Sequence, residues 1–292
     1  MTRQFAAFAL VVVVAAPTAR AEEAFEGARS LAMGGALRAA AVSNPSLYLN
    51  PAALAVGRLY HVEAAYQYEA GAQGHLANAS VVDSTNAVAG GIGATYSVSD
   101  PDHADRTAYD LRLGLGVPIG RAFSLGATLK YLHLIQDGVP RTGSPVAAEE
   151  GEPLLDDLTF DAGALLRVAS FLSFGVTGYN LTALDSPEAP MKVGFGAAVN
   201  VAELAVIDSD VILDLSTYGK VAARYGIGGE YFAANRYPLR VGYTIDPWLD
   251  QQFLSGGLGY VDQRFAAEVS VRQGIAGSSS TTVTAALRFF VH

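Results

Sequence analysis

The sequence contains no cysteine in its 292 residues, so it has neither a disulfide framework nor thiolate chemistry. Charged residues are only 16% of the chain, and 28 acidic residues outnumber 19 basic ones, which argues against nucleic acid as a partner. No Gly-x-Ser-x-Gly nucleophile elbow is present. The five histidines, which have no metal-ligand spacing, are His61, His75, His103, His133 and His292. The sequence therefore predicts no metal site, no cofactor and no enzymatic activity.

The long apolar run at the N-terminus is too short to span a membrane as a helix. It covers residues 5–17, follows Arg3, and precedes Ala19-Arg20-Ala21, which fits the small-x-small rule for cleavage. We therefore expect a signal peptide over residues 1–21 and an exported mature chain that begins at Glu22.

After residue 21, no apolar run approaches the roughly 20 residues of a membrane-spanning helix. Yet 51% of the chain is apolar, and glycine, tyrosine and phenylalanine are all common. Apolar content without long apolar runs is typical of a transmembrane β-barrel, because lipid-facing and lumen-facing residues alternate along each strand.

Alternation with a period of two begins near residue 58 and continues to the C-terminus. In one segment Leu111, Leu113 and Leu115 share a face, whereas Asp110 and Arg112 lie on the other. Alternation over about ten residues predicts strands long enough to cross a bilayer at a tilt. The fourteen predicted strands cover residues 58–69, 74–83, 86–98, 106–117, 122–134, 156–168, 171–181, 191–201, 204–216, 220–233, 236–246, 251–261, 264–273 and 280–291.

The predicted connections alternate in length. Those after even-numbered strands are short, whereas several after odd-numbered strands are longer and polar, as at residues 99–105, 136–155 and 182–190. Bacterial outer-membrane barrels have short periplasmic turns and longer external loops. Trp248 and Phe290 fall near strand ends, where aromatic girdles form. We therefore predict an all-β fold, a 14-stranded antiparallel transmembrane barrel over residues 58–292.

The inward face predicted for these strands carries charges of both signs. Two interpretations remain open: an ion-pair network that braces the barrel, or a selective polar pathway. The charges singled out as lumen residues are Arg112, Lys130, Asp161, Arg167, Arg224, Glu230, Arg240 and Glu268.

Residues 22–57 show no long alternation and precede the first strand. Asn50 is a good helix N-cap and Pro51 suits the first helical position, so a short helix is predicted up to Gly57. Gly34 and Gly35 are small enough to lie close to a barrel wall. Because fourteen strands enclose more space than their own side chains fill, we expect residues 22–57 to form a plug inside the barrel.

The stretch from Gly27 to Ala55 resembles the N-terminal segment of FadL-type outer-membrane proteins. These include transporters of long-chain fatty acids and aromatic hydrocarbons, and a branch that assists type IX secretion. The resemblance is carried by Gly27-Ala28-Arg29, Met33-Gly34-Gly35-Ala36 and Asn50-Pro51-Ala52. It implies a fourteen-stranded barrel with a plug, to which Met33, Gly34, Gly35, Asn50, Pro51 and Ala52 contribute.

The resemblance also implies a location and a function. We expect a bacterial outer-membrane protein, surrounded by outer-membrane lipid and inserted by the barrel assembly machinery. That machinery reads a C-terminal strand with a terminal aromatic residue, and here Phe289 and Phe290 stand just before the C-terminal His292. The expected function is passive transport of small hydrophobic, fatty-acid-like molecules. The alternative is a non-transporting scaffold or secretion-partner barrel, which short external loops and a salt-bridged lumen would favour.

FadL-type transporters release their substrate sideways through a kink in the third strand. The third predicted strand here contains Gly90, Gly91 and Gly93, and glycine inside a strand often marks a bulge or a close backbone approach. One hypothesis is a lateral opening near these residues. The alternative is close packing of the plug against small residues.

Overall fold

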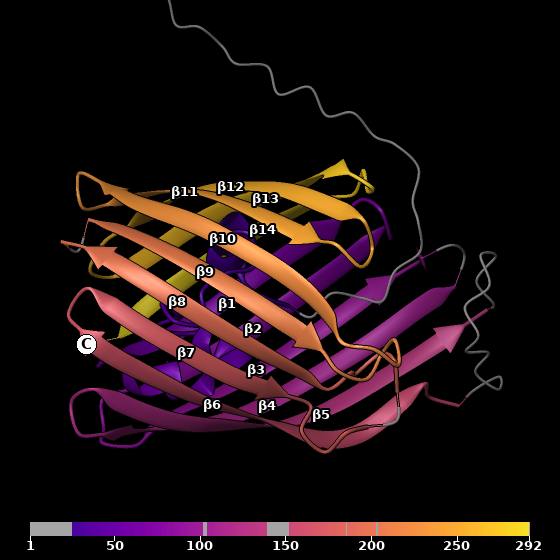
Figure 1. The fold of residues 1–292 in the computed structure, drawn as a ribbon, viewed down its shortest axis with the longest axis horizontal. Helices are drawn as coiled ribbons and strands as arrows, with labels where there is room; N and C mark the ends of the chain where they lie inside the picture. Colours follow the sequence, from indigo (N-terminus) through magenta and orange to yellow (C-terminus); the bar gives the residue numbers. More distant parts are fainter. Residues whose placement is uncertain (1–24, 102–103, 139–151, 185, 203, 292) are drawn as a thin grey trace, which may run out of the picture.

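The computed structural model describes residues 25–101, 104–138, 152–184, 186–202 and 204–291, so the predicted signal peptide lies outside the described residues. Fourteen antiparallel strands form a closed barrel (Figure 1). The strands are β1 (Tyr60–Glu69), β2 (Gly74–Asp83), β3 (Ala89–Ser99), β4 (Asp105–Ile119), β5 (Phe123–Asp137), β6 (Leu155–Ala169), β7 (Leu172–Tyr179), β8 (Lys192–Val201), β9 (Ala205–Asp214), β10 (Ala222–Ala233), β11 (Tyr237–Asp246), β12 (Gln251–Val261), β13 (Phe265–Ala276) and β14 (Thr281–Val291).

Each strand pairs with its neighbours in sequence, and β1 pairs with β14 to close the wall. The prediction of fourteen antiparallel strands is confirmed, and the observed bounds differ from the predicted ones by at most three residues. Register shifts interrupt the ladder beside Arg167, between β6 and β7, and beside Gln252, between β12 and β13. We call the end with the connections after even-numbered strands the short-turn end, and the opposite end the long-loop end.

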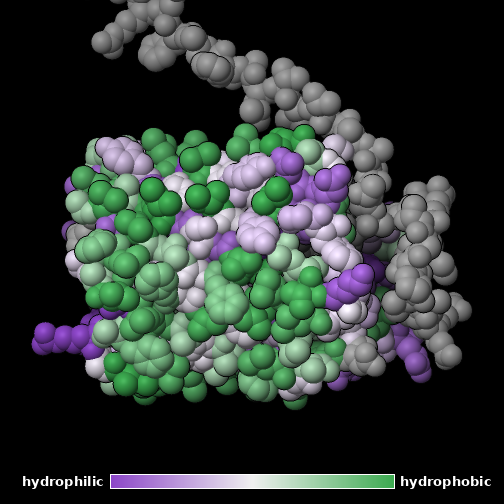
Figure 2. All heavy atoms as spheres, viewed as in Figure 1, coloured by the Kyte–Doolittle hydropathy of each residue, from purple (hydrophilic) through white to green (hydrophobic). Residues whose placement is uncertain are grey.

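The outward face of the wall is apolar over most of its height. Leu111, Leu113 and Leu115 are each about half exposed, while the residues between them point inward. Figure 2 shows apolar side chains over much of the visible face, with more polar ones near its centre and towards its right-hand end. Helices long and apolar enough to cross a membrane are absent from the part of the chain that the structure describes.

Residues 25–57, which we call the N-terminal segment, lie inside the barrel (Figure 1). The segment contains two short α-helices, α1 (Ala28–Ala32) and α2 (Ser46–Leu49), and one 3₁₀ helix, η1 (Pro51–Ala55). Helix α1 packs against the strands from β11 to β14, and η1 against those from β3 to β6. Most of its apolar side chains are fully buried, so it supplies much of the core that the barrel wall surrounds.

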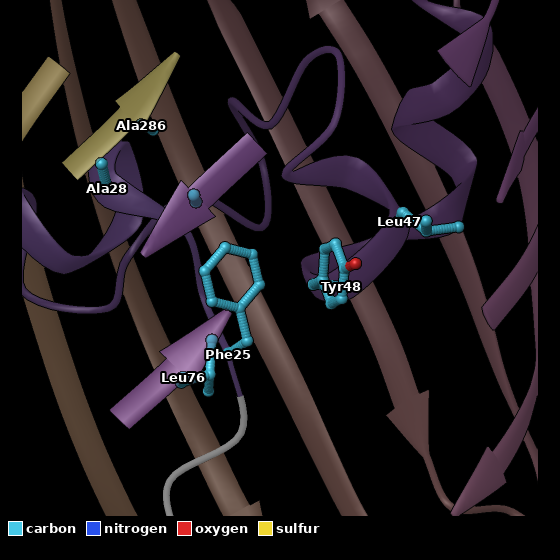
Figure 3. Close-up of a cluster of buried hydrophobic side chains, with 7 residues drawn as sticks. Phe25, Ala28, Leu47, Tyr48, Leu76 and Ala286 are labelled. Carbon is cyan, nitrogen blue, oxygen red and sulfur yellow. The ribbon is translucent and has the colours of Figure 1, made fainter. Parts of the chain in front are cut away.

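A hydrophobic cluster fastens the start of this segment where the barrel closes. The ring of Phe25 meets the ring of Tyr48 edge to face, with centroids 5.0 Å apart (Figure 3). Such aromatic pairs contribute about 0.5–1.5 kcal/mol beyond their buried area. The other members, which come from α1, α2 and strands β1, β2 and β14, are Ala28, Leu47, Ala65, Leu76 and Ala286.

Candidate functional site

A cavity of about 370 Å³ lies between the N-terminal segment and the loops of the long-loop end. Phe25, Glu26 and Tyr48 line it from the segment, and residues of the β7–β8, β9–β10 and β11–β12 connections line it from the loops. A second cavity of about 140 Å³ adjoins it towards β2–β6 and shares Phe25 and Arg112 with it. Together they have the size of a small-molecule site.

Tyr48 forms part of the cavity floor and is fixed from two sides. Its hydroxyl accepts a hydrogen bond from Nδ2 of Asn78 at 2.6 Å, and the guanidinium of Arg112 lies 4.5 Å from its ring centroid. The ring therefore receives both a hydrogen bond and a cation–π contact. The floor contributed by α2 is held in one orientation.

The charges that line the cavity are paired with one another. Arg112 bonds Asp110 at 2.7 Å, and Nζ of Lys130 lies 2.6 Å from Asp161. On the loop side, Glu188 pairs with Arg106 at 3.2 Å. Because each of these charges has a partner of opposite sign, the cavity is polar in part but does not concentrate one sign of charge.

The mouth of the cavity carries an aromatic pair. The rings of Tyr218, in the β9–β10 loop, and Trp248, in the β11–β12 loop, lie 5.2 Å apart. Their side chains are 38% and 45% exposed, and both also line the cavity. The sequence suggested only an aromatic girdle for Trp248, because nothing in the local pattern brings these two loops together.

Below the cavity, a chain of buried ion pairs links the N-terminal segment to five strands. Successive nitrogen–oxygen distances along it are 2.6, 2.6, 2.6, 3.7 and 2.5 Å. The side chains, in spatial order, are Arg29, Glu230, Arg240, Glu268, Arg288 and Glu63. This arrangement has the character of the bracing network that the mixed lumen charges suggested, and it includes Arg29 of the segment itself.

The other predicted lumen charges lie in two places. Arg112 and Lys130 line the cavity, and Asp161 pairs with Lys130. Arg224 also lines the cavity, 3.9 Å from Glu26 of the N-terminal segment. Arg167 lies at the short-turn end, where its Nη2 donates to the carbonyl of Arg121.

Asp208 and Asp210 hold the middle of the N-terminal segment, and the sequence analysis did not single them out. Oδ2 of Asp210 accepts from the backbone N–H groups of Leu37 and Arg38 and from Nη1 of Arg38, at 2.8–3.1 Å. Oδ2 of Asp208 accepts from the N–H of Ala40 at 2.9 Å. Because Asp208 and Asp210 are two residues apart on one strand, the sequence places their side chains on the same face of β9. Only the fold shows that this face contacts the N-terminal segment.

The Met33-Gly34-Gly35 motif touches the wall at β10 and β11. Gly34 and Gly35 have φ angles of +69° and +74°, which favour glycine. A Cβ on Gly34 would lie 2.7 Å from the carbonyl oxygen of Tyr243, and the hydroxyl of Thr244 donates to the carbonyl of Gly34. Both the turn and the close approach therefore require small residues here, and Met33 is fully buried beside them.

Asn50 caps η1, as its sequence position predicted. Its Oδ1 accepts from the N–H of Ala52 at 3.1 Å, and Pro51 is the first residue of the helix. Its Nδ2 donates to the carbonyl oxygens of Arg38 and Ala164, at 2.9 and 3.3 Å. One side chain thus joins η1, the middle of the segment and β6.

The earlier Asn-Pro step, Asn44-Pro45, directly precedes α2. Nδ2 of Asn44 donates a hydrogen bond to the hydroxyl of Ser80 on β2.

The structure does not support a lateral opening at Gly90, Gly91 and Gly93. Strand β3 pairs along its length with both β2 and β4, without a register shift. A Cβ on Gly93 would lie 2.8 Å from Cδ2 of Leu47 and 3.2 Å from Cζ of Tyr48. The glycines on the inner face admit α2, which is the close-packing alternative, and the wall stays closed because its ladder is complete here.

Among the residues that the structure describes, no group of three or more His, Asp or Glu side chains is placed to hold a metal ion.

No protein-family model and no curated protein matches the sequence. Solved structures do match the fold. The CymD monoaromatic hydrocarbon channel superposes with a TM-score of 0.69 at 13% identity, covering 91% of this chain and 97% of that one. The Ralstonia pickettii toluene transporter TbuX has a TM-score of 0.68 at 12% identity, covering 91% of this chain and 98% of that one. A Pseudomonas aeruginosa FadL homologue has a TM-score of 0.67 at 12% identity, covering 90% of this chain and 97% of that one. The chain therefore has the fold of a FadL-type barrel.

Proposed function

We propose that this chain is a passive channel for small hydrophobic molecules in the bacterial outer membrane. The observation that carries the proposal is the cavity of about 370 Å³, which faces the long loops and has the N-terminal segment as its floor. The apolar outward face supports a position in lipid, since alternating barrels expose apolar residues to the bilayer.

The similar structures support this class of substrate. They are described as channels or transporters for monoaromatic hydrocarbons and toluene. We therefore extend the proposal from fatty-acid-like molecules to small hydrophobic molecules in general. Molecules would enter at the long-loop end, occupy the cavity and leave towards the periplasm.

The N-terminal segment is the proposed gate. It lies between the cavity and the short-turn end, and its fixed contacts are the Arg29–Glu230 and Arg38–Asp210 ion pairs. In this proposal the segment shifts to let molecules pass, and β3, which is fully paired, offers no lateral exit at its glycines.

Uptake by whole cells tests the proposal. A Gram-negative host without an equivalent channel, expressing this chain, is given radiolabelled toluene, and uptake is compared with that of the same host carrying an empty vector. We expect several-fold faster uptake with the chain. Ala222 lines the cavity, so Ala222→Trp should return uptake to the vector level. The control is Ala77→Trp, whose side chain faces outward from β2.

Equal uptake with chain and vector, at normal amounts of folded barrel in the outer membrane, would overturn the proposal. The second candidate, a non-transporting scaffold or secretion partner, is favoured by the ion-pair chain that ties the segment to five strands. A variant lacking residues 22–50 separates the two. A scaffold predicts no uptake in the wild type, and a gate predicts faster uptake when the segment is removed.

A further inference from the structure

The aromatic pair at the cavity mouth is exposed although its rings touch. Tyr218 and Trp248 are 38% and 45% exposed, and their ring centroids lie 5.2 Å apart with the planes tilted by 38°. Both side chains also line the cavity. Aromatic side chains at the edge of a concave pocket are typical of ligand sites, since they offer large apolar faces to a bound molecule.

Both rings stand on loops that are fixed by carboxylates. Asp214 accepts hydrogen bonds from the N–H groups of Ser216 and Thr217, at 3.1 and 3.0 Å, and from the hydroxyl of Thr217 at 2.7 Å. Oδ1 of Asp246 accepts from the N–H of Leu249 at 3.0 Å. Turns held in this way keep their shape. The two rings are therefore positioned before a ligand arrives, which lowers the entropic cost of binding.

The cavity beneath the rings favours a neutral ligand. Arg112 and Lys130 are already paired with Asp110 and Asp161, and Glu188 with Arg106. An anion or cation would lose its hydration and compete with one of these pairs, which is costly in a buried site.

The same pairs leave acceptor oxygens for a ligand that donates a hydrogen bond. A carboxylate has about four lone-pair positions, and the side chains of Asp110 and Glu188 keep 19% and 10% of their surface exposed. Glu188 lines the cavity that Tyr218 and Trp248 also line, whereas Asp110 lines only the smaller cavity. Of the two carboxylates, Glu188 is therefore the acceptor that shares a cavity with the two rings.

We propose that Tyr218 and Trp248 form an aromatic clamp that selects small, neutral, hydroxyl-bearing aromatic molecules of the phenol class at the cavity mouth. The ring would lie against the two side chains, and the hydroxyl would donate to the carboxylate of Glu188. This inference rests on the proposed channel function and names its substrate class.

Trp248 is the only tryptophan in the chain, so its fluorescence reports on this site alone. Phenol is titrated into the full-length, detergent-solubilised protein, with excitation at the red edge of tryptophan absorption, where phenol and tyrosine do not absorb. We expect saturable quenching. Cyclohexanol lacks the ring, anisole lacks the donor and benzoate carries a charge, so each should bind more weakly than phenol.

Substitutions at Tyr218 test the clamp directly. Because an aromatic pair is worth about 0.5–1.5 kcal/mol, Tyr218→Leu should raise the Kd for phenol about two- to tenfold. Tyr218→Phe keeps the ring and should retain wild-type affinity, which also shows that the loop tolerates substitution. Tyr237→Leu is the matched control, because Tyr237 is 49% exposed and contacts Tyr260 at the short-turn end.

Equal binding of phenol and cyclohexanol, or an unchanged Kd in Tyr218→Leu, would overturn the clamp. Anisole or benzoate binding as tightly as phenol would overturn the assignment of a neutral donor. Uptake of toluene and of phenol by cells is measured separately. Uptake without selective phenol binding refutes the clamp and leaves the channel function intact. Selective phenol binding without uptake of toluene or phenol refutes the channel function.

Discussion

Nη2 of Arg29 lies 2.6 Å from Oε1 of Glu230, and Nε of Arg29 lies 3.0 Å from Oε2. One guanidinium therefore donates to both oxygens of a carboxylate that is 201 residues away in the sequence. The pair is buried and joins α1 to β10. Bidentate contacts of this kind are directional as well as strong. Glu230 also bonds Arg240 at 2.6 Å, which makes it the junction between the N-terminal segment and the wall.

We expect Arg29→Met to destabilise the barrel by about 3–5 kcal/mol, the usual effect of breaking a buried ion pair from one side. The change leaves Glu230 with Arg240 as its remaining cation at hydrogen-bond distance. Urea unfolding in lipid vesicles, followed by circular dichroism, measures the free energy of unfolding. Arg264→Met, in an exposed turn, is the control. Equal stability of the two variants would contradict a structural role for the pair.

The two carboxylates of β9 should respond differently to neutralisation. Asp210 accepts three N–H groups from Leu37 and Arg38, including the charged guanidinium, so Asp210→Asn should lower the unfolding free energy by about 1–3 kcal/mol. Asp208 accepts one backbone N–H, from Ala40, and an asparagine oxygen can replace that acceptor. Asp208→Asn should therefore leave stability unchanged or raise it, because a neutral amide beside the carboxylate of Asp210 keeps this acceptor without a second acidic group. Chemical denaturation measures the unfolding free energy of both variants. A larger loss for Asp208→Asn than for Asp210→Asn would contradict the conclusion that Asp210 makes the stronger contacts with the N-terminal segment.

Gly126 tests how closely the segment packs. A Cβ there would run into the backbone of Pro51 and Ala52, whereas one on Gly229, which faces outward, would meet nothing within 4 Å. Gly126→Ala should cost about 1–3 kcal/mol through overpacking, and Gly229→Ala should be neutral. Thermal unfolding in detergent compares the two. Equal unfolding temperatures for the two variants would contradict close packing of η1 against the barrel wall.

Leu129 tests the position of the membrane. It is 50% exposed and lies midway along β5, opposite Leu113 and Phe160 on the outward face. Leu129→Arg should cost about 2–4 kcal/mol in a bilayer, the value for a cation near the midplane of a barrel. Val88→Arg, in the β2–β3 turn, should cost far less. Folding titrations in vesicles measure both, and equal costs would contradict a bilayer centred on Leu129.

The strands could be predicted from sequence because their signal is local. Leu111, Leu113 and Leu115 alternate with inward residues, and that alternation follows from the geometry of any strand that separates two environments. The cap of η1 could also be predicted from the sequence, because Asn50 and Pro51 act within one turn of the helix that they begin.

The site was less predictable because it depends on contacts between distant segments. Asp210 gains its role only where the register of β9 brings it to Leu37 and Arg38, and Trp248 only where two loops meet at Tyr218. At the glycines of β3, by contrast, the sequence suggested a functional feature, a lateral opening, that the structure does not support. Gly93 allows a neighbour to come close, but the sequence does not say whether that neighbour is a packed side chain or an opening in the wall.

The long sequence separation of the Arg29–Glu230 pair bears on the order in which the parts of the barrel fold. The N-terminal segment is made first, yet its ion-pair partners lie on β9 and β10, and Ala28 packs near Ala286 on β14, the last strand. Contacts between residues so far apart form late and slowly. The segment therefore stays unattached at these points while the strands assemble, and the barrel completes its wall around residues that precede all of its strands in the sequence.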